Sequence, residues 1–256
     1  TLGYFSSDFQ NHAISYLMAG MLESHDKSRF ELIAFSFGPG KNDETRKRVA
    51  AAFDRFIDIR DKSDPEVAQL ARELGVDIAV DVNGFTQYAR SGIFACRAAP
   101  VQVNYLGYPG TMGVDYMDYI IADPTIIPDA NRSSFAEQIV YLPHCYQPND
   151  SRRQIADRLF TRAELGLPEE GFVFCCFNNN HKINPATFDS WMKILGAVEG
   201  SVLWLFEDNP AAANNLRNEA EKRGVSADRL VFARVMPLPE HLARHRAADL
   251  FLDTLP

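Results

Sequence analysis

A lysine and several side-chain amides stand together between an apolar run and an amphipathic segment. The loop reads Phe177-Asn178-Asn179-Asn180-His181-Lys182-Ile183-Asn184-Pro185 and follows the apolar run 172–176. This order predicts a strand, a polar loop and a helix. Because a helix amino terminus presents free N–H groups and lysine adds a full positive charge, such a loop can hold a diphosphate. We therefore expect an anionic ligand at this loop.

A second group of polar side chains follows the first predicted strand, residues 2–7. It reads Ser6-Ser7-Asp8-Phe9-Gln10-Asn11-His12, and a helical segment begins directly after it. One interpretation is structural: Asp8 or Asn11 caps the helix, and His12 occupies its first turn. The other is functional, because open α/β sheets bind ligands at the carboxyl ends of their strands, and Asp8 or His12 can accept a proton from a hydroxyl. The local pattern leaves both open.

Three glycines and a proline close the predicted strand 101–106, in Leu106-Gly107-Tyr108-Pro109-Gly110-Thr111-Met112-Gly113. The segment is either a plain surface turn or a place where the backbone comes close to a ligand. It is not the G-x-G-x-x-G dinucleotide fingerprint. The chain also lacks the G-x-x-x-x-G-K-[ST], H-E-x-x-H and G-x-S-x-G motifs, which disfavours P-loop, zinc-protease and serine-hydrolase chemistry.

Two histidines four residues apart, His241 and His245, lie in the predicted helix 239–246. The spacing puts both rings on one face and could hold a metal, but no third ligand is evident. We instead expect His241 to act beside the end of the preceding strand, near 232–237. The cysteines show no metal-ligand spacing, and the adjacent pair Cys175-Cys176 falls inside a predicted buried strand. We interpret the cysteines as reduced and structural.

Length and composition disfavour several classes of protein. With 256 residues, 46% of them hydrophobic, the chain is long enough for two domains with real cores. The net charge of −8 disfavours sequence-independent binding of nucleic acid, so Arg46-Lys47-Arg48 and Arg152-Arg153 are interpreted as solvated faces. No apolar run approaches the roughly 18 residues that span a bilayer. The chain is therefore predicted to be soluble and cytoplasmic, without a nucleic-acid or membrane partner.

Short apolar runs alternate with amphipathic segments along most of the chain. Strands alternating with helices predict parallel, doubly wound sheets, and the scheme occurs twice, so two Rossmann-like units are expected. A polar stretch with a proline, 147–153, separates them and divides the chain into 1–150 and 151–256. The last residues finish a strand, so the second unit is expected to be truncated. The predicted strands are 2–7, 31–37, 55–59, 77–82, 101–106, 119–122, 172–176, 202–206, 230–232 and 250–252, and the predicted helices are 13–23, 42–53, 65–74, 185–195, 211–223 and 239–246.

Several separated motifs, taken together, resemble those of one family. In chain order they are Gly3-Tyr4-Phe5-Ser6-Ser7-Asp8-Phe9 with Asn11-His12, Val82-Asn83-Gly84-Phe85-Thr86, Arg97-Ala98-Ala99-Pro100-Val101-Gln102, Leu106-Gly107-Tyr108-Pro109-Gly110-Thr111, Phe177-Asn178-Asn179 with Lys182-Ile183, Ser201-Val202-Leu203-Trp204-Leu205 and Leu252-Asp253-Thr254. This set is similar to the catalytic region of the O-linked N-acetylglucosamine transferases, in particular their bacterial branch. It spans nearly the whole chain. SPINDLY-type fucosyltransferases share much of the same pattern.

The resemblance implies a GT-B glycosyltransferase fold with two Rossmann-like domains. Its first domain, 1–150, would be the catalytic lobe on the side of the sugar and the acceptor, and its second, 151–256, would bind the nucleotide. The implied reaction transfers N-acetylglucosamine from UDP-N-acetylglucosamine to serine or threonine hydroxyls of proteins, with inversion and with neither a metal nor a cofactor. Transfer of fucose from GDP-fucose, and binding of a nucleotide sugar without turnover, are the alternatives.

The same resemblance implies roles for single residues. Asp8 matches an aspartate proposed to act in proton removal, and His12 matches a histidine beside the sugar and the acceptor; which of them is the base stays open. Lys182 matches the lysine that neutralises the departing UDP, whose growing charge must be offset by protein donors if no metal takes part. The implied donor contacts are Leu106 and Gly107 at the sugar, Asn179 in place of a glutamine at the diphosphate, and Met236, His241 and Arg244 at the uridine.

Parts of the family's machinery are expected outside this sequence. The histidine- and threonine-rich phosphate loop should follow residues 252–256 directly. The tetratricopeptide repeats, which present protein acceptors and could mediate self-association, should precede the catalytic region. We therefore expect the chain as given to be inactive and to act as part of a longer protein.

Overall fold

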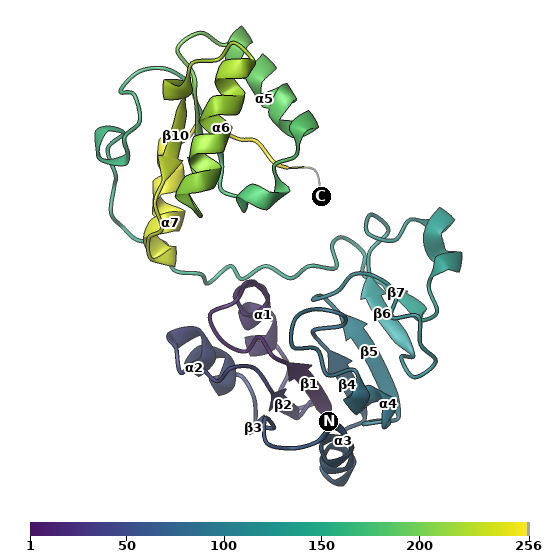
Figure 1. The fold of residues 1–256 in the computed structure, drawn as a ribbon. Coiled ribbons are helices and arrows are strands. Elements are labelled where there is room, and N and C mark those ends of the chain that lie inside the picture. The colour runs from purple at the N-terminus through teal and green to yellow at the C-terminus, as the bar shows by residue number, and fades with distance from the viewer. Residues whose placement is uncertain (255–256) are drawn as a thin grey trace. The chain divides into compact units, whose positions relative to one another are not determined.

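Two compact units make up the computed structural model, which describes residues 1–254 (Figure 1). The first unit is Thr1–Arg152, and the second begins at Arg153. The division falls inside the polar stretch 147–153. Within the described residues, no helix is both long enough and apolar enough to cross a membrane.

A seven-stranded parallel sheet forms the first unit. Its order is β3-β2-β1-β4-β5-β6-β7, so successive strands are added on one side of β1 and then, from β4 on, on the other. This is the order of a doubly wound Rossmann-like sheet, with its switch point between β1 and β4. The strands are β1 (Leu2–Ser6), β2 (Leu32–Ser36), β3 (Arg55–Asp58), β4 (Ile78–Asp81), β5 (Val101–Tyr105), β6 (Tyr119–Ala122) and β7 (Gln138–Tyr141), and the helices are α1 (Ala13–Glu23), α2 (Glu44–Ala51), α3 (Asp64–Glu73) and α4 (Gly92–Ala95).

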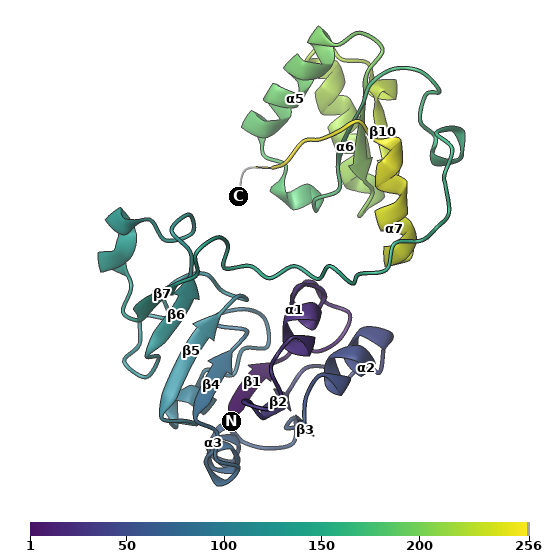
Figure 2. The same cartoon turned by 180° about the vertical axis from the view of Figure 1, so that it is seen from behind.

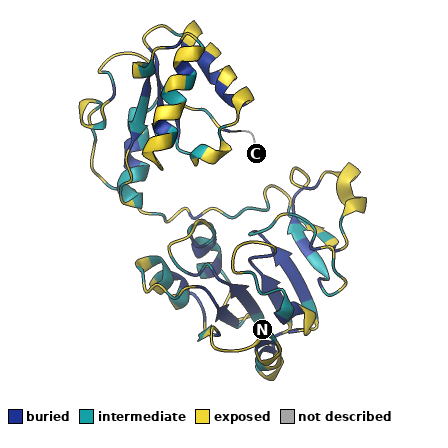
Figure 3. Ribbon diagram, in the orientation of Figure 1, coloured by how far each residue is buried: buried dark blue, intermediate teal, exposed yellow. Residues whose placement is uncertain are grey.

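Both faces of this sheet are covered. Successive side chains of a strand point to opposite faces. The rings of Phe5 and Phe35 stack on one face, with centroids 4.3 Å apart, in a cluster that includes residues of α3 and α4. Tyr4 and Ala34 belong to the other cluster, which includes residues of α1 and α2. Figure 3 shows the central strands as buried, which explains why β2, Leu32–Ser36, has no polar alternation.

The second unit carries a smaller parallel sheet in the order β10-β9-β8-β11, again with the switch point beside its first strand. The predicted fold class, α/β with two Rossmann-like units, is therefore confirmed. The strands are β8 (Val173–Cys176), β9 (Val202–Phe206), β10 (Leu230–Ala233) and β11 (Leu250–Phe251), and the helices are α5 (Pro185–Ala197), α6 (Pro210–Lys222) and α7 (Leu238–Arg244). Figure 2 shows the same elements from behind.

The core of the second unit also lies on both faces of its sheet. Cys176 belongs to the cluster formed with α5 and α6, and its neighbour Cys175 belongs to the cluster on the opposite face. The prediction that this pair is reduced and buried is confirmed. Cys96 and Cys145 are reduced too, but they are exposed, so the structural interpretation was wrong for those two.

Helix starts follow the capping residues in the sequence. The Asn184 side chain accepts a hydrogen bond from the Thr187 N–H at the start of α5, and Asn209 does the same for the Ala212 N–H at α6. Each asparagine is followed by a proline, which fits the first helical position because its missing N–H would have no partner there. The polar loop before α5 therefore ends at a defined residue.

The sequence analysis did not predict the helical turn α4 or the strand β7, and it misjudged the exposure of residues 46–48. The single turn α4 is too short for helical periodicity, and β7 is an edge strand whose side chains are only half-buried or exposed. The interpretation of Arg46-Lys47-Arg48 as a solvated face was wrong for its two arginines. The guanidinium of Arg46 bonds the Phe9 carbonyl, and that of Arg48 pairs with two carboxylates.

Candidate functional site

The carboxyl ends of β1 and β4 meet at the switch point of the first sheet. Phe5 of β1 stands opposite Asp81 of β4, so the residues that follow these strands come together although they are far apart in sequence. Ser7 and Asn83 are the first polar pair there, and both are buried. Ligands of open α/β sheets bind at this kind of position.

Asn83 connects the two strand ends through both of its amide atoms. Its Oδ1 accepts a hydrogen bond from the Ser7 N–H at 2.9 Å. Its Nδ2 lies within donor distance of Ser7 Oγ at 2.8 Å, Thr86 Oγ1 at 3.0 Å and Asp8 Oδ2 at 3.3 Å. Ser7 Oγ in turn donates to Asp8 Oδ1 at 2.8 Å. One buried amide therefore joins Ser7, Asp8 and Thr86 into a single network.

Asp8 is fixed on its backbone side as well. Its N–H donates to Ser6 Oγ at 3.0 Å, and its carbonyl accepts from Ser15 Oγ at 2.6 Å. The carboxylate accepts from Ser7 at one oxygen and from Asn83 at the other, and the side chain is 13% exposed. Asp8 is thus a largely enclosed carboxylate at the edge of the sheet and does not cap α1.

His12 is the residue that caps α1, because its Nδ1 accepts from the Ile14 N–H at 3.3 Å. The expected capping by Asp8 or Asn11 was wrong. The same Nδ1 lies 3.6 Å from Asp8 Oδ2, and the ring is 46% exposed. If Nδ1 carries its proton toward Asp8, Nε2 is left as a free acceptor for a hydroxyl proton. If Nδ1 accepts from Ile14, the neutral ring carries its proton on Nε2 instead.

The glycine-containing loop after β5 lies against the same network. A side chain at Gly107 would come within 2.0 Å of the Val82 carbonyl oxygen, so only glycine allows the loop to approach β4. Leu106, directly before it, has a φ of 73°, a left-handed conformation that is costly for a leucine. Asn104 holds the loop by donating from Nδ2 to the carbonyls of Tyr108 and Gly110.

The buried carboxylate of Asp81 holds the backbone of Asn83 in place. Asp81 Oδ1 accepts from the Asn83 N–H at 2.9 Å and from the Gly84 N–H at 3.1 Å. Burial raises the pKa of Asp81 to about 6, although these two hydrogen bonds lower it. The sequence prediction did not name Ser7, Asp81 or Asn83 as site residues. Ser7 and Asn83 lie in motifs that carry the family resemblance, and Asp81 is a polar residue that interrupts an apolar run.

The second unit has its own polar strand ends at the switch point between β8 and β11. Asn178, just after β8, donates from Nδ2 to Asp253 Oδ1 at 2.7 Å and to Thr254 Oγ1 at 2.8 Å. The following residues Asn180–Lys182 form one 3-10 turn that leads to α5. Asn179 and Lys182 are both exposed on this turn. Among residues 1–254, no carboxylate lies within ion-pair distance of Lys182.

Arg244 is buried without a carboxylate partner among the described residues. It is 1% exposed, and its Nη1 donates to the Arg234 carbonyl at 2.7 Å. Its guanidinium carbon lies 4.8 Å from the centroid of the Phe177 ring and 5.6 Å from that of Trp204. Arg244 therefore connects the end of β10 to the first residue after β8.

His241 accepts a hydrogen bond from Arg244 at Nδ1. Burial and the Arg244 charge lower the pKa of His241 to about 4, with a smaller contribution from His245. The ring is therefore neutral near pH 7 and carries its proton on Nε2, where it can donate to a ligand. His245 Nδ1 bonds the His241 carbonyl at 2.8 Å, so both Nδ1 atoms are occupied by protein groups.

The predicted site residues thus form two groups. Asp8, His12, Leu106 and Gly107 lie together at the carboxyl edge of the first sheet. The second group lies around the carboxyl ends of β8 and β10 and comprises Asn179, Lys182, Met236, His241 and Arg244. Met236 is half-buried in the segment between β10 and α7. Among residues 1–254, no cluster of three or more His, Cys, Asp or Glu side chains is arranged to hold a metal ion.

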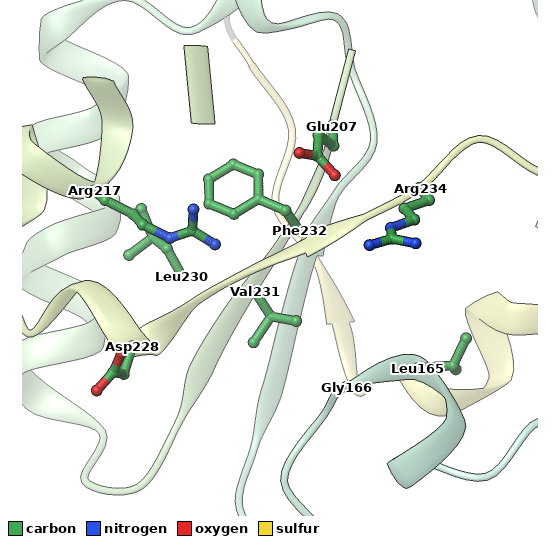
Figure 4. Close-up of a pocket in the computed structure, with 9 residues that line it drawn as sticks. All are labelled: Leu165, Gly166, Glu207, Arg217, Asp228, Leu230, Val231, Phe232 and Arg234. Atoms are coloured by element: carbon green, nitrogen blue, oxygen red, sulfur yellow. The ribbon is translucent and has the colours of Figure 1, made fainter. Parts of the chain in front are cut away.

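A separate hollow opens at the edge of the second sheet (Figure 4). Strand β10 crosses it, and the Arg217 guanidinium points toward the Phe232 ring, 4.5 Å from its centroid. Glu207 and Arg234, which directly follow β9 and β10, line the hollow at the carboxyl ends of these strands. None of the described residues that line this hollow is a predicted site residue, so we do not include it in the site.

Two Rossmann-like units, each with polar side chains gathered at its switch point, are the domain composition of GT-B glycosyltransferases, and the solved structures that the chain resembles share it. The sequence profile of glycosyl transferase family 41 matches residues 1–159 and 149–256. The chain belongs to this family.

Individual relatives agree with this assignment. The chain is 36% identical over 258 residues to a probable UDP-N-acetylglucosamine–peptide N-acetylglucosaminyltransferase SEC of Arabidopsis thaliana, covering 99% of this chain and 26% of that protein. It is 32% identical to the SPINDLY protein of Oryza sativa subsp. japonica, which carries the same activity in its name, covering 100% of this chain and 28% of that protein.

A solved structure is similar as well. A lysine-to-methionine mutant of Thermobaculum terrenum O-GlcNAc transferase superposes with a TM-score of 0.88 at 32% identity, covering 100% of this chain and 48% of that one. The chain therefore spans about a quarter of these curated relatives and about half of the solved one.

Proposed function

We propose that the protein containing this chain transfers N-acetylglucosamine from UDP-N-acetylglucosamine to serine or threonine hydroxyls of proteins. Its family supports the reaction class, and the names of its relatives support the donor and the acceptor. The observation that carries the proposal is the position of Lys182. It is an exposed cation in the loop that joins the first strand of the second sheet to α5, where a doubly wound fold binds the phosphates of a nucleotide.

The reaction proposed is a single displacement with inversion. The acceptor oxygen attacks the anomeric carbon from the face opposite UDP, the bond to the UDP oxygen breaks, and UDP leaves with the electron pair. Lys182 offsets the negative charge that grows on the diphosphate, and Asn179 adds an amide donor beside it. A preorganised charge is worth most where charge develops in the transition state, so this lysine can act without a metal.

The acceptor proton goes to a group of the first unit. In the proposed mechanism it moves to the Asp8 and His12 pair, which the network at the carboxyl edge of β1 and β4 holds in place. His241 donates from its neutral ring to the nucleotide base, while Arg244 keeps that ring in one tautomer. Protein acceptors, and self-association through the expected repeats, belong to the longer protein.

Replacing Lys182 tests this proposal in the full-length protein. We expect Lys182→Ala to lower kcat by about 10²-fold or more, the scale for losing one charge contact that is made in the transition state. The matched control is Lys193→Ala, which removes an exposed lysine from α5, eight residues after its first residue. This control should keep its activity. A loss of less than about threefold in Lys182→Ala would contradict the role of this lysine.

Calorimetry with UDP and GDP side by side tests the donor. Tighter binding of UDP is expected. Tighter binding of GDP would move the donor toward GDP-fucose. Binding of a UDP-sugar with no transfer to any protein, in the unaltered full-length chain, would indicate a binding protein without turnover and would overturn the proposal.

A further inference from the structure

We propose that Asn83 is a positioning residue for the transfer reaction, because it fixes the Asp8 carboxylate at the edge of the first sheet. This inference rests on the proposed function. Asn83 is fully buried and touches Asp8 through a donor, Nδ2, while its acceptor, Oδ1, binds the Ser7 N–H. The two halves of the amide therefore have separate tasks. Oδ1 holds the chain after β1, and Nδ2 orients the carboxylate.

The network allows one orientation of the amide. With Oδ1 on the Ser7 N–H, the two protons of Nδ2 face the hydroxyl of Ser7, the hydroxyl of Thr86 and the carboxylate of Asp8. A flipped amide would place its oxygen against the Asp8 carboxylate, which is also an acceptor. Two acceptors facing each other are repulsive, so the flip is disfavoured. The backbone of Asn83 is fixed as well, because its N–H donates a hydrogen bond to Asp81 Oδ1.

The consequence for catalysis passes through Asp8. Asp8 Oδ2 is the oxygen that faces both Asn83 Nδ2, at 3.3 Å, and His12 Nδ1, at 3.6 Å. Holding this oxygen fixes the carboxylate relative to the imidazole, whichever of the two takes the acceptor proton. A misplacement of about 1 Å at such a pair can cost about 10²-fold in rate.

Asn83→Asp tests the positioning of Asp8 separately from the hydrogen bond that holds the chain at Ser7. The new side chain keeps an oxygen for the Ser7 N–H but replaces the donor with a second carboxylate oxygen beside Asp8. In the full-length protein we expect kcat to fall by about 10²-fold, with the KM for the nucleotide sugar changed by less than about threefold, because most of the residues proposed to bind the donor, including all of those at its nucleotide, lie in the second unit. We also expect the acidic limb of the pH profile of kcat to move to higher pH, because two adjacent carboxylates cannot both ionise easily.

The matched control is Gln102→Glu. Gln102 is also a fully buried amide, but it lies at the amino end of β5, where its Nε2 donates to the carbonyls of Phe94 and Tyr116. The same chemical exchange there should lower stability and leave the pH profile of kcat in place. If Asn83→Asp does not fold, Ser7→Ala replaces it as the test. That variant removes the hydroxyl that donates to Asp8 Oδ1 and should lower kcat about tenfold.

The outcomes separate this inference from the proposed function. A large loss of kcat with a displaced pH profile in Asn83→Asp, absent from Gln102→Glu, supports it. Equal losses in both variants with unchanged pH profiles would reduce Asn83 to a structural residue and overturn the inference alone. If the unaltered full-length protein transfers no sugar to protein acceptors, the proposed function fails, and the positioning role fails with it.

Discussion

Arg244 donates a hydrogen bond from Nη2 to His241 Nδ1 across 2.6 Å, and the buried Arg244 and the half-buried His241 both contact Phe177. An arginine remains charged at all ordinary pH values, so its partner nitrogen must stay an acceptor. Burial, together with the charge of Arg244, lowers the pKa of His241 to about 4 from its ordinary value of 6.5. The pair therefore holds His241 in one tautomer as well as in one position.

A pH dependence of stability follows from the lowered pKa of His241. The unfolded chain binds a proton at His241 below about 6.5, whereas the folded chain does so only near 4. The contribution of His241 is therefore present above pH 6.5 and is lost as the pH falls toward 4. His241→Asn keeps an acceptor for Arg244 but does not titrate. Urea unfolding at pH 7.5 and pH 4.5 should show a smaller loss of unfolding free energy in the variant than in the unaltered protein, and an equal loss would contradict the assignment.

In the first unit, Asp81 should change stability with pH in the opposite direction from His241. Burial raises its pKa from 3.8 to about 6, so the folded state binds the proton more tightly, and its contribution becomes more favourable as the pH falls through 6. Asp81→Asn keeps an oxygen for the N–H groups of Asn83 and Gly84 without the buried charge. At pH 7.5 we expect the variant to be more stable by about 3 kcal/mol, because the pKa of Asp81 differs by roughly two units between the folded and the unfolded chain. Near pH 4 the difference should vanish, and a variant that is less stable at pH 7.5 would contradict this account.

The elements could be predicted from the sequence because their signal is local. Within residues 1–254, apolar runs and helical periodicity located every strand except the half-exposed edge strand β7, and α1, β6 and β9 have the predicted bounds. The site was predicted less completely. Asp8 and His12 were found from their place after a strand, but the role of Asn83 depends on its contact with Ser7, 76 residues away.

That contact depends on which residues of β1 and β4 stand opposite each other. Phe5 pairs with Asp81, and a shift of the register would take Asn83 away from Ser7. Periodicity says that a strand exists and not which residue of another strand it faces. The same holds for Arg48, whose partners Glu23 and Asp150 lie 25 and 102 residues away in the sequence. Because Arg48 stands in a run of three basic residues, the local sequence indicated a solvated face.

Arg48 should contribute strongly to the stability of the first unit. Its Nε lies 2.7 Å from Glu23 Oε1, and its Nη1 lies 2.6 Å from an oxygen of Asp150, whose side chain is only 2% exposed. Arg48→Met keeps much of the apolar stem but leaves the Asp150 carboxylate without this guanidinium. We expect the free energy of unfolding at pH 7.5 to fall by about 3 kcal/mol, the scale for removing one partner of an enclosed ion pair.

Lys47→Met is the matched control for that loss, because Lys47 pairs with Glu44 on the exposed side of the same helix and such a pair is worth less than about 1 kcal/mol. The pH dependence of the loss in Arg48→Met provides a second check. A hydrogen bond from Arg48 holds the pKa of Glu23 below its ordinary value of 4.5, so the stabilisation is present above that value and is lost as the pH falls below it. The difference between Arg48→Met and the unaltered protein should therefore shrink in urea unfolding at pH 3.5. A difference that stays constant down to that pH would contradict the assignment of this loss to the ion pair with Glu23.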